Sequence, residues 1–423
     1  MKTTTCNNEI EFLEKWGRVI EEFDKRGGDG RAIAESLDYL YAAYSDGLPT
    51  WLAGLYDKEV GGFYYSNSAR DNKGFLPDIE STVQAMNFMR SSGMVSSAKE
   101  LPEEMKKGIE RFVKGLQSSD DGFIYHPQWG KDITDSRRGR DMMWACVASE
   151  QLEFTLPYPT ANERLKDASK NEEDEKQNGM PEFLSSKEAM IKYLDGFDWV
   201  NDAYYAGNMI AAQAQQIIAA GLADTVVEYV NQYQNPENGF WYKDVDMHYG
   251  INGFMKITSL YIKAGAPIPR AELAADSAMS LLLTDEIGTT VCHLYNVWVS
   301  LTAILYSLRK SKNPEDTEAA ERIAKKLLKI APLAIRNSRT KSGVFQKDDG
   351  SFSYIRERSC HRSQGAPVCL PNMDEGDVNA SCISSTGIIS NIYSALEAGC
   401  VKVPLYTEKD YAAFLSVLKL DLS

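Results

Sequence analysis

Apolar residues recur along the chain at the spacing of amphipathic helices. One stripe in residues 105–116 places its apolar members on a single helical face, and these are Met105, Ile109, Phe112, Val113 and Leu116. Similar stripes occur in residues 79–86 and 323–330. Alternation of apolar and polar residues, the pattern of a half-buried strand, is scarce and short. The pattern therefore predicts a mainly α-helical, all-α fold.

A turn motif recurs between the predicted helices. It consists of a glycine followed by an aromatic residue, often with a second aromatic residue two positions later. Its four copies are centred on Phe63, Phe123, Phe240 and Phe352, so successive copies are 60, 117 and 112 residues apart. The last two spacings are each close to twice the first. A repeat of about 58 residues fits two helices and two loops, which is an αα-hairpin.

Two intermediate units lack the full motif. Phe197 with Tyr204 occupies the first position, and residues 290–298 occupy the second. The charged segment 161–179 precedes Phe197, and we expect it to be a solvated surface insert that lengthens this unit. Six such hairpins predict one domain, residues 1–423, with the helices closed into a ring. An open helical solenoid is the alternative.

These hairpin units and their turns resemble the (α/α)6 toroid superfamily. Its members include six-hairpin glycosidases, α-toroid polysaccharide lyases, sugar 2-epimerases, and prenyltransferase or terpene-cyclase toroids. Residues 56–63 (YDKEVGGF) are most similar to the "YD…GGF" turn of the sugar-epimerase branch. The resemblance covers roughly residues 30–400. It implies a toroid of six helical hairpins, in which one end of the inner helices forms a funnel where the members act.

Composition narrows the class of protein further. The 423 residues are 43% hydrophobic and 25% charged, so the chain can bury a large core. Its 46 basic and 60 acidic residues give a net charge of −14, which repels nucleic-acid phosphates. No apolar run approaches the roughly 18 residues of a membrane span, and the polar first nine residues do not resemble a signal peptide. We expect a cytoplasmic protein with a small carbohydrate substrate, no nucleic-acid partner and no membrane partner. The oligomeric state is left open.

Cysteine usage and missing motifs exclude several kinds of site. Seven cysteines without a CxxC pair indicate neither a disulfide framework nor structural zinc. Cys292 precedes His293, but adjacent side chains on a helix point apart. There is no P-loop, no GxGxxG after a strand, no metal-ligand spacing, and no DDxxD or DxDD string. We expect no cofactor and no metal, and a terpene synthase is disfavoured.

Acid-rich helix starts provide the candidate catalytic groups. Asp78 and Glu80 follow Pro77 at one predicted start, and Glu375 and Asp377 precede another. Capping would explain the first pair without any function, and an exposed acidic loop would explain the second. In a closed ring the last hairpin meets the first, so the acids could supply the two carboxylates of glycoside hydrolysis. We therefore expect all four to be catalytic, with Asp78 favoured as the general acid.

Three further segments provide candidate substrate-binding residues. Residues 137–144 hold three arginines, and Arg offers bidentate contacts to carboxylate or phosphate, although salt bridging is the alternative. Residues 247–256 and 292–298 each combine His, Tyr and Asn, which can move protons or polarise a carbonyl. The predicted binding residues are Arg140, Asp141, Trp144, Trp241, His248, Tyr249, Asn252, His293, Tyr295 and Trp298. Ordinary core packing would also explain the aromatic members.

These observations favour a glycoside hydrolase of oligosaccharides that uses a pair of carboxylates. A sugar epimerase with His248 and His293 as its acid/base pair is one alternative. A polysaccharide lyase is another, but such lyases are usually exported. A non-catalytic toroid that binds a glycan or a protein is the third.

Overall fold

The computed structural model describes residues 2–44, 47–168, 181–242 and 246–420. Within these ranges the chain is mainly helical, which confirms the predicted all-α class. Its strands form two short antiparallel hairpins, β1 (Tyr56–Asp57) with β2 (Gly62–Phe63) and β3 (Arg362–Ser363) with β4 (Ala366–Pro367). No helix in the described ranges combines the length and apolarity that a membrane crossing requires.

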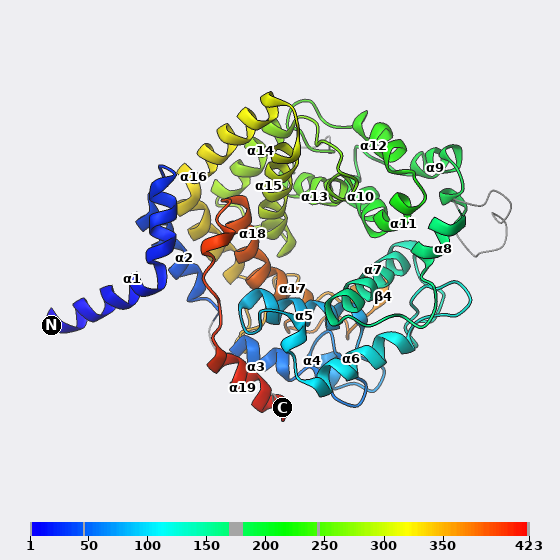
Figure 1. Ribbon diagram of the computed structural model, residues 1–423, viewed down its shortest axis with the longest axis horizontal. Coiled ribbons are helices and arrows are strands. Elements are labelled where there is room, and N and C mark those ends of the chain that lie inside the picture. The colour runs from blue at the N-terminus through cyan, green and yellow to red at the C-terminus, as the bar shows by residue number, and fades with distance from the viewer. Residues whose placement is uncertain (1, 45–46, 169–180, 243–245, 421–423) are drawn as a thin grey trace.

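One set of helices surrounds the middle of the molecule (Figure 1). In chain order it comprises α5 (Ile79–Ser92), α7 (Asp135–Leu152), α10 (Ala203–Ala212), α13 (Met247–Ala264), α15 (Cys292–Lys310), and a last segment of α17 (Val378–Cys382), a π-helical turn (Ile383–Gly387) and α18 (Ile388–Ala395). Each member packs against the next, and α17 packs against α5. The contact between the last member and the first closes the ring, which an open solenoid would leave apart.

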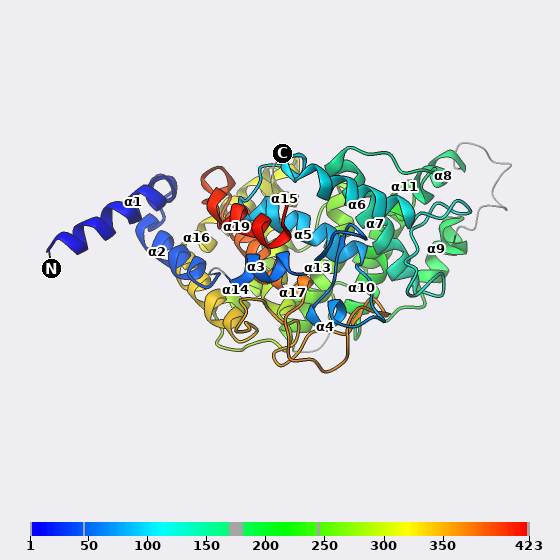
Figure 2. The same ribbon diagram turned by 90° about the horizontal axis from the view of Figure 1, so that it is seen from below.

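The remaining helices lie outside this inner set (Figure 1). They are α1 (Lys2–Lys25), α2 (Gly30–Tyr41), α3 (Gly47–Ala53), α4 (Asn67–Arg70), α6 (Glu103–Gly115), α8 (Ala161–Ala168), α9 (Lys187–Leu194), α11 (Ala214–Ala219), α12 (Ala223–Asn231), α14 (Ala271–Leu283), α16 (Pro314–Gly343) and α19 (Glu408–Leu418), with short 3-10 turns at Ala98–Glu100, Glu182–Leu184 and Gly399–Val401. The three apolar stripes fall in α5, α6 and α16, so these helix predictions are confirmed. Seen from the side, α1 projects from the body, and the connection from α16 to α17 runs along one face (Figure 2).

The four glycine-aromatic turns share one backbone conformation. Their glycines have left-handed φ values of 86° (Gly61), 74° (Gly122), 75° (Gly239) and 83° (Gly350). The following aromatic side chains are buried in the core, and they are Phe63, Phe123, Phe240 and Phe352. In the last three turns an Asp or Asn side chain before the glycine accepts the backbone N–H two residues later. The sequence motif is therefore a true structural repeat.

Replacing a turn glycine should destabilise the fold. At Gly122 an added Cβ would lie 2.3 Å from the carbonyl oxygen of Pro159, and φ is 74°. We expect Gly122→Ala to lower the free energy of unfolding by about 1–3 kcal/mol in urea denaturation, because both strain and a backbone clash oppose the side chain. Gly115→Ala is the matched control, since nothing lies within 4 Å of its added Cβ. An unchanged Gly122→Ala midpoint would contradict this account of the repeat.

The predicted surface insert at 161–179 differs from expectation in its first half. Residues Ala161–Ala168 form α8 rather than a loop, because Thr160 and Glu163 make reciprocal hydrogen bonds between side chain and backbone N–H. This pair is a capping box, and it starts a helix in a segment whose charge alone indicates a loop. Residues 169–179 lie outside the described ranges.

Candidate functional site

The first predicted acid cluster lies at the start of α5, facing α7. Asp78 is the N-cap of α5 and accepts hydrogen bonds from the N–H of Ser81 (3.0 Å) and from its hydroxyl (2.7 Å). Glu80 accepts hydrogen bonds from Arg140 Nε (2.8 Å) and from the Ser363 hydroxyl (2.9 Å). Both carboxylates are 2% exposed. The structure thus commits both acids to partners within the chain.

Electrostatics keep Glu80 ionised. Burial raises the pKa of Glu80, but Arg140 and, more weakly, Arg137 outweigh burial and bring the pKa to about 2. A group with this pKa holds no proton to donate near neutral pH, so Glu80 is not a general acid. Burial raises the pKa of Asp78, and the nearby charge of Arg137 partly offsets that effect.

The second acid cluster meets the first hairpin, as ring closure predicts. Glu375 accepts hydrogen bonds from the Ser66 hydroxyl (2.8 Å) and the Ser68 N–H (2.8 Å). Asp377 is the N-cap of α17 and accepts the N–H groups of Ala380 (2.8 Å) and Tyr354 (3.0 Å). Glu375 is 8% exposed and Asp377 is fully buried. Both acids join the two ends of the ring, and neither faces solvent as an exposed acidic loop would.

The arginine-rich segment forms the start of α7. Asp141 is fully buried and pairs with Arg137, with Nη2 2.9 Å from its carboxylate. Salt bridging, the alternative considered from the sequence, therefore explains Asp141, and the structure does not support a binding role for it. Arg140 pairs with Glu80 and lies 5.8 Å from the ring of Trp144. Arg140 and Trp144 each keep part of their surface exposed.

Polar side chains from the inner helices, and one from the connection between α16 and β3, lie around Arg140. We call them the central cluster, and its members are Glu80, Arg140, Tyr204, Lys256, Cys292 and Tyr354. Tyr204 and Tyr354 lie near enough to Arg140 to raise its pKa. Arg140 and Cys292 in turn both affect the pKa of Lys256. The Cys292 thiol donates to the Tyr354 hydroxyl at 3.3 Å. All members except Glu80 keep part of their surface exposed to solvent.

Lys256 has an unusual environment for a lysine. Burial, together with the positive charge of Arg140, lowers the pKa of its ammonium to about 8. Its Nζ lies 5.9 Å from the ring centroid of Tyr204. With the residues of the described ranges it makes neither a hydrogen bond nor an ion pair. Lys256 therefore lacks an ion-pair partner in the described ranges, and a small fraction of it is unprotonated near neutral pH.

The sequence prediction missed Lys256 as well as Tyr204 and Tyr354. A signal for Lys256 exists, because it follows His248 and Asn252 at successive i+4 positions on one face of α13. Tyr295, which was predicted, is partly exposed, and burial raises its pKa to about 12.

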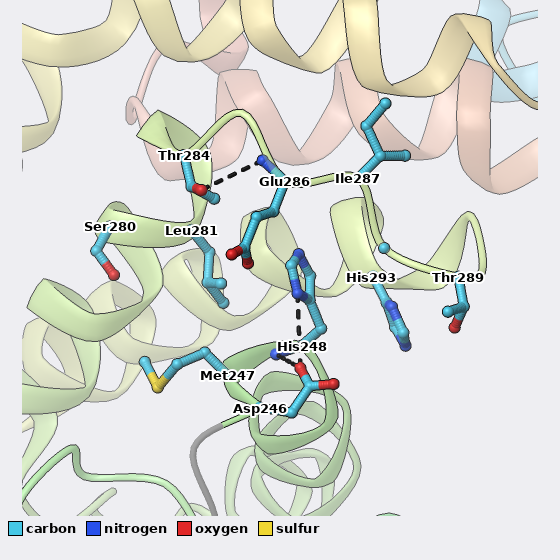
Figure 3. A pocket seen from close by; sticks show the side chains of 11 residues that line it. Asp246, Met247, His248, Ser280, Leu281, Thr284, Glu286, Ile287, Thr289 and His293 are labelled. Atoms are coloured by element: carbon cyan, nitrogen blue, oxygen red, sulfur yellow. Dashed lines mark hydrogen bonds and ion pairs between the residues drawn. The ribbon is translucent and has the colours of Figure 1, made fainter.

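His248 and His293 line a separate cavity. Its volume is about 690 Å³, and it lies between the starts of α13 and α15, the end of α14, and the loop that follows α14 (Figure 3). The two imidazole ring centroids are 5.4 Å apart. Burial lowers the pKa of both imidazoles, that of His293 to about 4, so both are neutral at pH 7. The cavity shares no lining residue with the central cluster.

Several predicted binding residues belong to the core instead. Trp241 and Trp298 are fully buried, and their indole N–H groups donate to the Val230 carbonyl (2.9 Å) and the Ser338 hydroxyl (3.0 Å). Neither offers a free face to a ligand, so the structure does not support stacking on a sugar. Asn252 is 6% exposed and accepts the Asn296 amide at 2.6 Å.

Tyr249 lies at the edge of the histidine pair. It is 45% exposed, and its ring centroid is 5.5 Å from that of His293 in an edge-on arrangement. Within the described ranges, no group of three His, Cys, Asp or Glu side chains is placed to hold a metal ion.

Comparison with known proteins gives a fold likeness only. No protein-family model matches the sequence, and no curated protein matches it significantly. Among solved structures, the chain is similar to an aspartate-to-alanine variant of the type II terpene cyclase MstE from Scytonema, described in complex with its product merosterolic acid A. The match covers 86% of this chain and 99% of the other, at 12% identity and a TM-score of 0.40. Similarity at this level carries no argument about activity.

The prediction of a glycoside hydrolase is wrong. The four predicted catalytic acids are buried and bonded to partners within the chain. For Asp78 and Asp377 the capping interpretation accounts for the observed contacts. In the described ranges, the central cluster holds partly exposed polar side chains and the histidine pair lines a cavity, so both are candidate ligand sites.

Proposed function

We propose that the ring is an (α/α)6 toroid of six hairpins and that the central cluster is the active site of an enzyme acting on a small anionic substrate. A carboxylate or phosphate group of the substrate would lie against Lys256. Toroid enzymes would be expected to place a site where the inner helices converge, and the central cluster draws on α5, α7, α10, α13 and α15. The predicted single domain, cytoplasmic location and lack of nucleic-acid or membrane partners stay predictions.

The observation that carries the proposal is the uncompensated amine of Lys256. The Arg140 charge is neutralised by Glu80, whereas Lys256 lacks a carboxylate partner within the described ranges. An unpaired charge inside a protein is costly, and an anionic ligand would remove that cost. Ligand binding would also return the pKa of Lys256 toward its ordinary value, because an opposite charge favours the ammonium form.

The cluster also contains the groups for a proton transfer. With a pKa of about 8, part of the Lys256 population is an unprotonated amine at neutral pH before a ligand binds. This amine can take up the proton that the substrate releases, and the ammonium that forms then pairs with the substrate anion. The Tyr204 and Tyr354 hydroxyls interact with each other beside Arg140, and Cys292 donates to Tyr354. We therefore assign Lys256 as the base and the two tyrosines as the groups that orient the substrate.

Lys256→Met should abolish stabilisation by anionic ligands. Thermal unfolding of the wild type is measured with inorganic phosphate, acetate, pyruvate and citrate, and with the uncharged analogue acetamide. An anion that fits should raise Tm, since a ligand at about 100 times its Kd adds about 2.7 kcal/mol of stability. Lys192→Met, an exposed lysine on α9, loses the same charge elsewhere and should respond like the wild type. If no anion raises Tm, or if both variants respond alike, the site is wrongly assigned.

Proton transfer is tested separately by deuterium exchange. An anion that stabilises the wild type and carries an acidic C–H bond should exchange that hydrogen for deuterium in D2O, followed by NMR. Loss of exchange in Lys256→Met with exchange retained in Lys192→Met would support catalysis. Binding without exchange would indicate a binding protein instead of an enzyme.

A further inference from the structure

We propose that the cavity beside His248 and His293 is a second binding site, which takes a small organic cation with N–H donors, such as a primary ammonium or a guanidinium. This proposal does not depend on the function proposed for the central cluster, because the two sites have no residue in common. Its volume of about 690 Å³ lies within the range of small-molecule sites.

The polar groups that line the cavity are mainly hydrogen-bond acceptors. Asp246 and Glu286 contribute carboxylates, and Figure 3 shows the Glu286 carboxylate beside the imidazole of His248. The Thr284 hydroxyl oxygen already accepts the Glu286 N–H at 3.2 Å, and the Ser280 hydroxyl donates its hydrogen to the Ser277 carbonyl at 2.7 Å. A ligand that carries N–H donors therefore matches most of these groups.

The histidines add further acceptors without adding positive charge. His293 is 4% exposed, and its Nδ1 has no hydrogen-bond partner within the described ranges. Its ring and the ring of His248 lie 5.4 Å apart, and burial keeps both imidazoles neutral at pH 7. A neutral imidazole presents one acceptor nitrogen, so two imidazoles and two carboxylates favour a cationic donor over an anion.

Lys341, a buried lysine near the cavity, already has a hydrogen-bond partner. Lys341 is 7% exposed, and its Nζ donates to the Leu281 carbonyl at 2.9 Å. Burial lowers the pKa of Lys341, and the nearby carboxylates of Asp285 and Glu286 partly offset that effect. Within the described ranges Lys341 forms no ion pair with Asp246 or Glu286, although its charge is felt by Glu286, so a bound ammonium or guanidinium would add a direct partner for these carboxylates.

Gly288 gives the cavity its shape next to His293. An added Cβ at Gly288 would lie 2.3 Å from the His293 Cβ and 2.4 Å from its Nδ1. Only a glycine allows the loop after α14 to pass this close to the imidazole. Gly288→Ala should therefore displace the His293 ring and change the cavity without removing a charge.

The test is isothermal titration calorimetry of the full chain with putrescine, agmatine and 1,4-butanediol, in buffer containing EDTA. Butanediol matches the length of putrescine but carries no charge. We expect putrescine or agmatine to bind at least tenfold more tightly than butanediol. Equal affinity for the diol, or no diamine binding at millimolar concentration, would overturn the proposal.

Charge variants locate the binding. Asp246→Asn keeps an N-cap on α13, and Glu286→Gln alters an exposed side chain, so both should fold. Each should weaken cation binding about tenfold, equivalent to about 1.4 kcal/mol. Glu237→Gln makes the same charge change on an exposed loop outside the cavity and should bind like the wild type. Unchanged cation affinity in both cavity variants would show that the cation binds elsewhere and would refute the assignment.

Discussion

Glu80→Gln is expected to lower the free energy of unfolding by about 3–5 kcal/mol, because it leaves Arg140 without its carboxylate partner and Arg137 with only Asp141 and Asp78. Glu80 is 2% exposed, and it pairs with Arg140 at 2.5 Å and with Arg137 at 3.5 Å. The amide oxygen of the variant can still accept the hydrogen bond from Ser363, so the loss of stability measures the effect of removing the charge. Urea denaturation of the purified variant measures it.

A double-mutant cycle supplies the control. Arg140→Met in the Glu80→Gln background removes one unpaired charge, and we expect it to recover part of the lost stability. Additive effects of the two substitutions would show that the ion pair does not couple α5 to α7.

The same carboxylate should make wild-type stability depend on acid pH. The folded-state pKa of Glu80 is about 2, against 4.5 for the unfolded chain. A depressed pKa contributes stability that is complete above 4.5 and is lost as pH falls toward 2, and here it amounts to about 3 kcal/mol. Glu80→Gln should lack this part of the dependence, and an identical acid profile for both proteins would contradict the assignment.

Trp298→Ala should destabilise the protein by about 3–5 kcal/mol, which is the cost of emptying a large core position. Its side chain is fully buried and its indole N–H donates to the Ser338 hydroxyl. Trp298→Phe keeps most of the apolar volume but leaves Ser338 without this donor, so its cost should be smaller. Urea denaturation compares the two variants.

The control for Trp298 is an exposed aromatic residue. Tyr205 is 52% exposed, and Tyr205→Ala should change stability by no more than about 0.5 kcal/mol. If Trp298→Ala were as stable as Tyr205→Ala, a ligand-binding role for Trp298 would have to be reconsidered.

The buried, bonded state of the four predicted acids was not evident from the sequence, and the reason is physical. An N-cap and a catalytic carboxylate have the same sequence signature, an acid before an apolar-periodic helix. Ring closure does bring Glu375 and Asp377 to the first hairpin, where Glu375 bonds to Ser66 and Ser68. However, the residues that neutralise Glu80, namely Arg140 and Arg137, lie about 60 positions away on another helix. Sequence patterns do not indicate which partner satisfies which acid.

The amino-acid sequence by itself determined the local structure of this protein. Apolar periodicity located α5, α6 and α16, and the recurring glycine-aromatic turns follow from backbone strain that only glycine relieves. Only the tertiary structure decided which polar side chains have hydrogen-bond or ion-pair partners. In the folded chain Glu80 pairs with Arg140, and Trp298 is fully buried. Lys256 has no ion-pair partner in the described ranges, and His248 lies beside His293. These outcomes depend on contacts between residues far apart in the chain, and the energies of such contacts exceed any local preference.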